Sequence, residues 1–441
     1  MKQLTIQLLG DHGWRDVAVL ELPRPEEGAA GPCLVEYDFD YAVQRLRDVG
    51  PGERGRHAIA WRVPVDTTAH RFGRWPAFLD DVRPGGAARR WWVSRLGLGF
   101  LPEPEQDVPL LERGAIAPIG NLRIKQAVPN ERDVPIRFPL AAVVDRDHDF
   151  LDHAAEMGAS VGGATGAGGE APKLLLRVSD ADEVWIDTWQ DLIDVPDRHY
   201  LVKFARNQRS DIDRTVLRSE YVYYRALAEL GVDTVDVDAM RLIEGEREPS
   251  LWLPRFDVDR REGREVRYGV ESLYSLIDAP PGSWQKHQTY LAALREVFRE
   301  QPDFDPSALV VEYLWRDLLN LVFGNTDNHG RNAAVLKTPE GMRLAPVYDF
   351  APMKMDPEGV VRTTRWDQFE RGGHIDWAGL IDSLDAYADP DAIRSQLQAR
   401  ARKLIDLPER LRRLGLPEET LRFPPMGLDT TERKLERWGL L

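Results

Sequence analysis

The chain has 441 residues, of which 43% are hydrophobic and 30% are charged, a composition that excludes wholesale disorder and predicts two or three folded domains. Its net charge of −15 argues against broad, sequence-independent binding to nucleic acid, which depends on neutralising phosphates. Cys33 is the only cysteine, which excludes an internal disulfide. The sequence contains no run of about 18 apolar residues, the length that a membrane-spanning helix needs. We therefore predict a cytoplasmic protein with no membrane partner.

The first hundred residues predict a small β-rich unit, because short alternating runs such as QLTIQLLG are typical of half-buried strands. The segment from Phe78 has a helical pattern that is broken at Pro84-Gly85-Gly86. Residues 101–139 contain repeated prolines and predict a connecting segment. We interpret four nearby arginines as solvated surface residues, with a local basic patch as the alternative: Arg83, Arg89, Arg90 and Arg95.

A second unit is predicted to begin near residue 140. The Gly-rich stretch GASVGGATGAGGEAPKLLLRV leads into a strand, and HYLVKFA, from His199, predicts another. The run from Arg214 has helical spacing and ends near a glycine, as a helix C-cap would. RLIEG and PSLWLPRFDVD predict two further strands, so this unit mixes sheet and helix.

From about residue 284 the pattern is mainly helical. Two amphipathic helices are predicted, and the second runs directly into GNTDNHGRN at residues 324–332. AAVLKT, a Gly turn and MRLAPVYDF predict a β-hairpin with Asp349 at its end, followed by more helix and a charged tail. The predicted domains are therefore 1–139, 140–283 and 284–441.

Three residues with side-chain oxygens have the spacing that phosphoryl transfer requires. Asn332 follows Asp327 by five residues, and Asp349 lies twenty-two beyond Asp327. A protein kinase needs a catalytic-loop Asp beside the attacking hydroxyl, an Asn on Mg²⁺ five residues later, and a second metal-binding Asp in a following turn. Mg²⁺ prefers oxygen ligands, so we predict that Asn332 and Asp349 bind it and that Asp327 accepts the hydroxyl proton. An Asx-rich turn without catalytic role is the alternative.

Two neighbours of Asp327 are predicted to support the loop. Asn325 and His329 are expected to hold its backbone through hydrogen bonds. Direct proton transfer by His329 remains the alternative, although phosphoryl transfer requires little acid–base chemistry.

The middle unit supplies candidate nucleotide-binding residues. Lys203, in the strand-like YLVKF, is placed to reach nucleotide phosphates, with Glu220 in the next helix as its ion-pair partner; an exposed strand lysine is the alternative. Gly162 and Gly163 belong to a loop whose backbone amides could approach phosphates, together with Lys173 in the strand that follows. A flexible linker is the alternative for this loop.

With these residues identified, the chain resembles the HipA-type toxin serine/threonine kinases of bacterial toxin–antitoxin pairs. GNTDNHGRN resembles the family's N-x-D-x-H-x-x-N catalytic loop, YDF with the following Ala-Pro resembles its metal-binding turn, and LPRFDVDR resembles its segment near the adenine pocket. EYDFDYA and FLDDVRPGGAAR resemble its small N-terminal domain, so the resemblance covers nearly the whole chain. It implies an α+β, two-lobed protein-kinase-like fold with a small β-rich N-terminal domain and a mainly helical C-terminal lobe.

The resemblance also assigns roles to single positions. It makes Asp327 the catalytic base, gives Asn332 and Asp349 the Mg²⁺, and places Lys203 on the ATP phosphates. It further implies that Arg255 and Phe256 border the nucleotide, and that a residue of the Gly-rich loop is autophosphorylated, Ser160 or alternatively Thr165. A phosphate there would repel ATP unless the loop moved.

The implied function is an ATP- and Mg²⁺-dependent serine/threonine kinase toxin. The resemblance implies a translation component as target, typically an aminoacyl-tRNA synthetase, and a DNA-binding antitoxin of HipB type as partner, with DNA contacted only through that antitoxin. Two alternatives remain open: a small-molecule phosphotransferase on a kinase-like fold, and a catalytically silent co-repressor.

Overall fold

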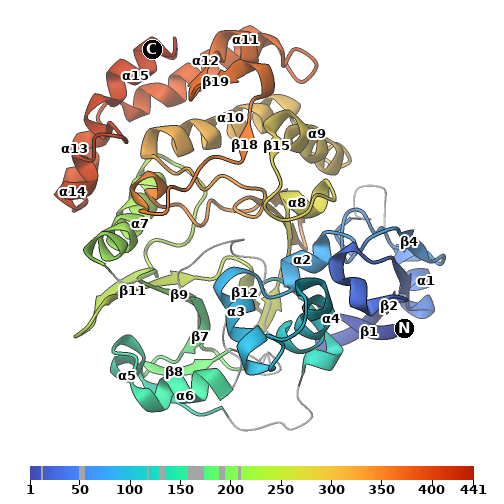
Figure 1. Cartoon of the computed structure of the whole chain (residues 1–441). Coiled ribbons are helices and arrows are strands. Elements are labelled where there is room, and N and C mark those ends of the chain that lie inside the picture. The colour runs from blue at the N-terminus through green and yellow to red at the C-terminus, as the bar shows by residue number, and fades with distance from the viewer. Residues whose placement is uncertain are drawn as a thin grey trace.

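The computed structural model describes residues 1–10, 13–48, 55–116, 119–128, 135–156, 173–187, 194–206 and 210–441. A helical C-terminal region lies at the top of Figure 1, a larger sheet lies below it, and an N-terminal unit lies beside that sheet. The predicted phosphate-binding and autophosphorylation positions of the Gly-rich loop lie outside the described residues: Ser160, Gly162, Gly163 and Thr165.

The N-terminal unit is built on a five-stranded sheet in the order β4-β3-β2-β1-β5. The long hairpin of β1 (Lys2–Gly10) and β2 (Gly13–Leu22) alternates buried and exposed residues, so one face of the sheet packs on the core. The predicted β-rich unit is confirmed. Its other elements are β3 (Cys33–Tyr37), α1 (Phe39–Asp48), β4 (His70–Phe72) and β5 (Leu122–Ile124).

The helical segment from Phe78 is confirmed as α2 (Phe78–Val82) and α3 (Gly86–Arg95), which are separated at the predicted break. The connecting segment predicted for 101–139 is wrong over α4 (Glu103–Gly114). Pro104 lies in the first turn of α4, where no backbone N–H is needed, and α4 buries the apolar side chains of Val108, Leu110 and Leu111.

The arginines of this segment are not a solvated surface group. Arg83 pairs with Asp80 at 2.7 Å, and Arg89 pairs with Asp107 at 2.7 Å, with both guanidinium groups largely buried. Only Arg90 and Arg95 of the four are exposed. The sequence interpretation is therefore wrong for Arg83 and Arg89, because buried carboxylates from neighbouring helices hold them.

The larger sheet has six strands in the order β10-β11-β9-β7-β8-β6. The predicted strands and the helix α7 (Asp211–Glu229) are found, with a Ser210–Asp213 capping box at the start of α7. In Figure 1, α5 and α6 lie on the side of this sheet away from the helical region. The strands and remaining helices are β6 (Phe138–Pro139), α5 (Leu140–Val144), α6 (His148–Glu156), β7 (Lys173–Val178), β8 (Glu183–Ile186), β9 (Arg198–Phe204), β10 (Arg241–Glu244) and β11 (Pro249–Pro254).

Two small sheets join this part to the helical region. The hairpin of β12 (Val258–Arg261) and β13 (Arg264–Arg267) precedes a three-stranded sheet in the order β14-β16-β17. The predicted hairpin before Asp349 is confirmed as β16 and β17. The elements are β14 (Gly269–Ser272), α8 (Leu273–Leu276), β16 (Ala334–Thr338) and β17 (Gly341–Leu344). The domain limits at 139 and 283 stay a prediction.

The C-terminal region is mainly helical, as predicted. Short strand pairs, β15 (Gln285–Lys286) with β18 (Thr364–Arg365) and β19 (Glu370–Arg371) with β20 (His374–Ile375), lie among its helices. Those helices are α9 (His287–Phe298), α10 (Pro306–Phe323), α11 (Trp377–Asp382), α12 (Pro390–Ala401), α13 (Leu407–Arg413), α14 (Glu418–Leu421) and α15 (Thr431–Arg437).

The predicted charged tail is wrong. Leu435 in α15 is fully buried and Leu440 is 1% exposed, so apolar residues between the charges anchor the last segment to the core. None of the described helices combines the length and the apolar character needed to span a membrane.

Candidate active site

The polar loop predicted from GNTDNHGRN follows α10 directly. Gly324 ends α10 in the left-handed region, with φ of 70°, a conformation that glycine adopts without a Cβ penalty. Asn325 is buried at the start of the loop; its Oδ1 accepts from the backbone N–H of Asp327 at 3.2 Å, and its Nδ2 donates to Asn320 at 3.0 Å. These bonds tie the backbone of Asp327 to the end of α10.

His329 lies beside the side chain of Asp327. The backbone N–H of Arg331 donates to His329 Nδ1 at 3.3 Å, so in the neutral ring Nε2 carries the proton. That Nε2 is 3.3 Å from Asp327 Oδ1, and the ring stacks on Tyr274. The geometry makes His329 a group that orients the Asp327 carboxylate.

Asn332 has an oxygen suited to a metal ion. Its Nδ2 donates to the backbone oxygen of Asp327 at 2.6 Å, whereas its Oδ1 is buried and has no hydrogen-bond partner among the described residues. A buried acceptor without a partner is costly, and a hard cation would satisfy it. The described residues contain no group of three or more His, Cys, Asp or Glu that could hold a metal, so a metal here would take an amide, a carboxylate and oxygens from outside the protein.

Two lysines face each other across β7 and β9. Lys173 and Lys203 are direct cross-strand partners, an arrangement of like charges that is unfavourable unless an anion separates them. Asp349 supplies that anion: Lys173 Nζ is 3.1 Å from its Oδ2, and Lys203 Nζ donates to its Oδ1. Lys203 also donates to Glu220 Oε1, in α7, at 2.6 Å. Asp349, Lys203 and Glu220 therefore form one ion-pair chain between the sheet and the helical region, in which Lys203 and Glu220 are buried and Asp349 is partly exposed.

Opposite charges in this ion-pair chain keep Asp349 and Lys203 ionised. Burial alone would raise the pKa of Asp349, but the ammonium groups of Lys173 and Lys203 hold the pKa of that carboxyl well below its usual range. Burial would likewise lower the pKa of Lys203, yet Asp349 and Glu220 raise it above its usual range. Burial lowers the pKa of Lys173. Asp349 is thus available as an anionic oxygen ligand, which it presents from a positive-φ backbone.

The ion-pair chain lies where two cavities meet. Lys173, Lys203 and Asp349 line both cavities, and Asp327 lines the one that also contains Glu220. Asn332 lines a further cavity with Asp327 and is tied to the Asp327 backbone. The cavity that Lys173, Lys203 and Asp349 line without Asp327 is mainly apolar, and its shape suits a flat ring. Its apolar side chains are Ile119, Leu201, Val235, Leu253, Phe256 and Tyr348.

The two residues predicted to border the nucleotide differ in role. Phe256 stacks on Tyr348 in the apolar cavity, with ring centroids 5.3 Å apart. Arg255 borders the same cavity, but its side chain is 1% exposed and its guanidinium is bound by Asp257 and Asp187. Arg255 therefore acts on this cavity by fixing its wall.

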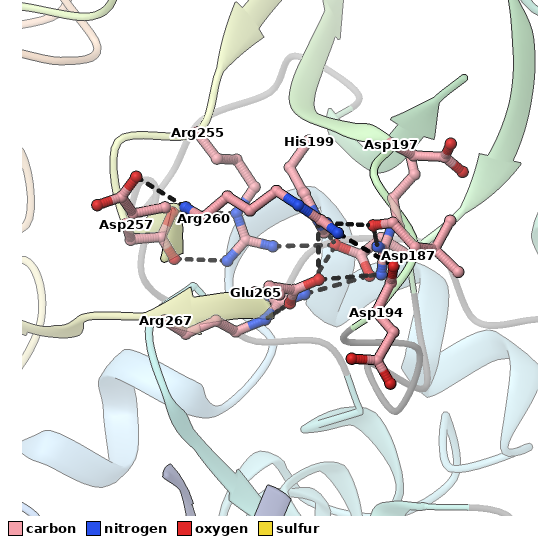
Figure 2. Close-up of polar contacts among 12 residues, drawn as sticks. Asp187, Asp194, Asp197, His199, Arg255, Asp257, Arg260, Glu265 and Arg267 are labelled. Atoms are coloured by element: carbon pink, nitrogen blue, oxygen red, sulfur yellow. Dashed lines mark hydrogen bonds and ion pairs between the residues drawn. The ribbon is translucent and has the colours of Figure 1, made fainter. Parts of the chain in front are cut away.

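Arg255 belongs to a network that sequence reasoning missed. Figure 2 shows acidic and basic side chains of this network, which point toward one another. His199 lies between Asp187 at 2.9 Å and Glu265 at 3.0 Å, and Arg267 contacts Asp187 at 3.1 Å and Glu265 at 2.6 Å. We call the following residues the buried ion network: Arg177, Asp187, His199, Arg255, Asp257, Glu265 and Arg267.

Sequence reasoning also missed how the N-terminal unit holds the polar loop at residues 324–332. Arg331 is 2% exposed, and its Nη2 donates to the backbone oxygen of Asp80, in α2, at 2.7 Å. Tyr348 donates to the backbone oxygen of Arg331 at 2.6 Å. The sequence offered one signal for this contact: an arginine, a residue type that is usually exposed to solvent, lies inside the polar motif.

Known proteins resemble this chain in sequence and in fold. A family model described as HipA-like C-terminal domain matches residues 162–406. The serine/threonine-protein kinase toxin HipA of Shewanella oneidensis is 24% identical over 255 residues, which are 52% of this chain and 53% of that protein, so the match spans about half of the relative's length. A chain in the complex of HipA, HipB and operator DNA from Shewanella oneidensis MR-1 aligns with a TM-score of 0.63 and 17% identity, covering 98% of this chain and 97% of its own. The predicted fold class is confirmed.

Proposed function

We propose that this chain, which belongs to the HipA-like C-terminal domain family, is a serine/threonine protein kinase that uses ATP and Mg²⁺ and acts as the toxin of a toxin–antitoxin pair. The observation that carries the proposal is the convergence of Asp327, Asp349 and Lys203 on one cavity, next to an apolar cavity that suits a nucleobase. Phosphoryl transfer depends mainly on positioning and electrostatic stabilisation, and these groups supply both.

Each residue has a role that follows from its contacts. Asp327, oriented by His329, accepts the proton of the substrate hydroxyl as its oxygen attacks the terminal phosphorus of ATP, and the bond from that phosphorus to the leaving ADP oxygen breaks. Lys203, held by Glu220, binds the phosphates. Phe256 and Tyr348 bind the base in the apolar cavity.

Asn332 and Asp349 would hold the metal. The partnerless Oδ1 of Asn332 and the anionic carboxylate of Asp349 fit a hard cation. Bound Mg²⁺ would neutralise charge on the nucleotide phosphates. Without Mg²⁺, the ammonium groups of Lys173 and Lys203 are bound to the carboxylate oxygens of Asp349. The lysines would therefore move from Asp349 to the phosphates as the nucleotide and the metal bind.

The finer parts of the proposal come from the family resemblance. The target is a translation component such as an aminoacyl-tRNA synthetase, the partner is a DNA-binding antitoxin of HipB type, and Ser160 or Thr165 is autophosphorylated. Support for the partner comes from the similar fold of a chain in a HipA, HipB and operator DNA complex. Phosphopeptide mass spectrometry after incubation with ATP and Mg²⁺ tests the two loop positions, and absence of phosphate from both would remove that part.

The kinase proposal is tested with radiolabelled ATP and cell extract. We expect labelled protein bands with the wild type, none with Asp349→Asn, and unchanged bands with Asp385→Asn, which replaces an exposed aspartate on the same lobe. Label confined to small metabolites would instead indicate a small-molecule phosphotransferase. No wild-type labelling at all would favour a catalytically silent co-repressor.

A further inference from the structure

A cavity of about 410 Å³ lies between the N-terminal sheet and the strands β13 and β16. Its walls include residues of β1, β2 and α1 with Arg56 and His57 on one side, and residues of β13 and β16 on the other. It is separate from the cavities that contain Asp327 and Asp349. Its volume falls in the range of small-molecule sites.

The cavity is basic, although the protein is acidic. Among the described residues that line it, Glu265 is the one carboxylate, and Arg267 binds this group at 2.6 Å. Lys337 is likewise paired, with Glu271 at 2.7 Å. Five cationic side chains of the described residues line the cavity, together with His57: Arg15, Arg45, Arg56, Arg267 and Lys337. Such an excess of positive charge in a concave site, within a chain of net charge −15, favours an anionic ligand.

Two of these arginines have no carboxylate partner within the described part of the chain. Arg15 donates to the neutral side chain of Gln44 at 2.9 Å, and the ion pairs of the described residues include neither Arg15 nor Arg45. The Nε of Arg45 is buried and forms no hydrogen bond to a described residue. A buried guanidinium nitrogen without an acceptor is a group that a bound anion would satisfy.

Tyr41 holds both guanidinium groups in position. Their Cζ atoms lie 5.0 Å (Arg15) and 5.4 Å (Arg45) from the centroid of the Tyr41 ring, within cation–π range. The ring is buried, and its hydroxyl donates to the backbone oxygen of His57 at 2.7 Å. Planar guanidinium groups fixed on a rigid ring lose little entropy when they bind a planar or tetrahedral oxyanion.

We propose that this cavity binds a small phosphorylated metabolite that carries at least two negative charges, with Arg15 and Arg45 as its principal ligands. Guanidinium groups form paired hydrogen bonds with phosphate oxygens, so the side chains of Arg15 and Arg45 suit such a ligand. The proposal does not depend on the kinase chemistry, because none of these side chains touches Asp327 or Asp349.

Neighbouring His57 offers a direct report on the cavity. Burial, followed by the charges of Arg45 and Arg56, lowers the pKa of His57 to about 4. The other titratable groups that face the cavity are Arg15, Tyr41, Glu265, Arg267, Tyr268 and Lys337. A bound anion would oppose the arginine charges, so it should raise the pKa of His57 by roughly one unit or more.

Calorimetric titration of the full-length protein with inorganic pyrophosphate, without Mg²⁺, tests the proposal. We expect saturable binding that weakens roughly tenfold or more in Arg45→Gln and in Arg15→Gln. Arg47→Gln, an exposed arginine of α1 that does not line the cavity, is the matched control and should bind as the wild type does. Lys203→Gln and Asp327→Asn should also leave this binding unchanged, which separates it from the nucleotide site.

Three results would overturn the proposal: no pyrophosphate binding at millimolar concentration, binding unaffected by both arginine substitutions, or binding abolished by Lys203→Gln. Arginine-dependent binding of a short DNA duplex without binding of pyrophosphate would assign the cavity to nucleic acid instead. Histidine NMR supplies the second measurement, since a His57 signal whose pKa is unmoved at saturating pyrophosphate contradicts binding at this place.

Discussion

The polar loop at residues 324–332 and the buried ion network are both rich in polar groups, but the charges of the network pair with one another, whereas side chains of the loop line cavities. In the loop, Asn332 Oδ1 is left without a hydrogen-bond partner among the described residues, and the Asp327 carboxylate faces a cavity. In the network, Asp187 is fully buried and is contacted by His199, Arg255 and Arg267. Matched buried charges fix structure, whereas unmatched oxygens beside a cavity mark where a ligand binds.

The largest expected effect breaks the loop side of this comparison. Asp327→Asn keeps the size of the side chain but removes the proton acceptor, so kcat should fall by roughly 10²–10⁴-fold. Steady-state transfer of labelled phosphate measures it. Thermal stability and Mg²⁺–ATP affinity should stay near wild type, because Asp327 is not among the proposed metal ligands; a loss of nucleotide binding would show that Asp327 has a binding role instead.

The next effect breaks the network side. Asp187→Asn leaves Arg255 and Arg267 buried without one of their counter-charges, so the free energy of unfolding should fall by about 3–5 kcal/mol. Chemical denaturation measures it, with Asp194→Asn as control because that carboxylate is 80% exposed. Equal stability of the two variants would mean that solvent reaches Asp187 and that the network does not hold the sheet.

The pH dependence of stability tests the role of Glu265 in the buried ion network. Burial would raise the pKa of Glu265, but the charge of Arg267 and the hydrogen bond from His199 lower it to about 2 from 4.5. A folded pKa below the unfolded one gives stability that is complete above about pH 4.5 and is lost as pH falls towards 2. In Glu265→Gln this dependence should flatten, as measured by denaturation between about pH 5 and pH 3.

The smallest expected effect concerns His329, whose role the sequence left open. If His329 orients Asp327, His329→Gln should lower kcat by roughly tenfold, because the amide can still donate to the carboxylate, and should leave the pH profile unchanged. If His329 itself transfers the proton, the pH–rate profile should lose an ionisation. Comparing the pH–rate profiles of the wild type and of His329→Gln distinguishes a positioning role of His329 from proton transfer by it.

How much could be predicted from the sequence follows the same division. The loop and the turn at Asp349 carry their chemistry in short, fixed spacings, and the pairing of Lys203 with Glu220 was predicted from the strand–helix order. The network as a whole could not be predicted, because Asp187 follows β8 and is far in sequence from its partners His199 on β9, Arg255 after β11 and Arg267 on β13. Local spacing relates only Arg255 to Asp257 and Glu265 to Arg267, whereas their contacts with Asp187 depend on tertiary packing.

Two of the wrong predictions, the connecting segment at 101–139 and the charged tail, have a common physical origin. Prolines at 102 and 104 suggested a loop, yet the start of a helix accommodates them, and the buried face of α4 decided its structure. In the terminal segment the charged residues outnumber the apolar ones, but Leu435 and Leu440 are buried. In both cases a few apolar contacts from elsewhere in the fold outweighed local composition.

The hydrogen bond from Arg331 to Asp80 has a consequence for how the protein can be dissected. Through this bond α2 supports the polar loop at residues 324–332, although more than two hundred residues separate them in the chain. A fragment limited to the region that the family model matches, residues 162–406, would lack α2. Arg331 would then lose its hydrogen bond to Asp80 and lie at a surface that α2 no longer covers. Excising the amino-terminal third should therefore disturb the geometry around Asp327, even though the fragment retains Asp327, Asp349 and Lys203.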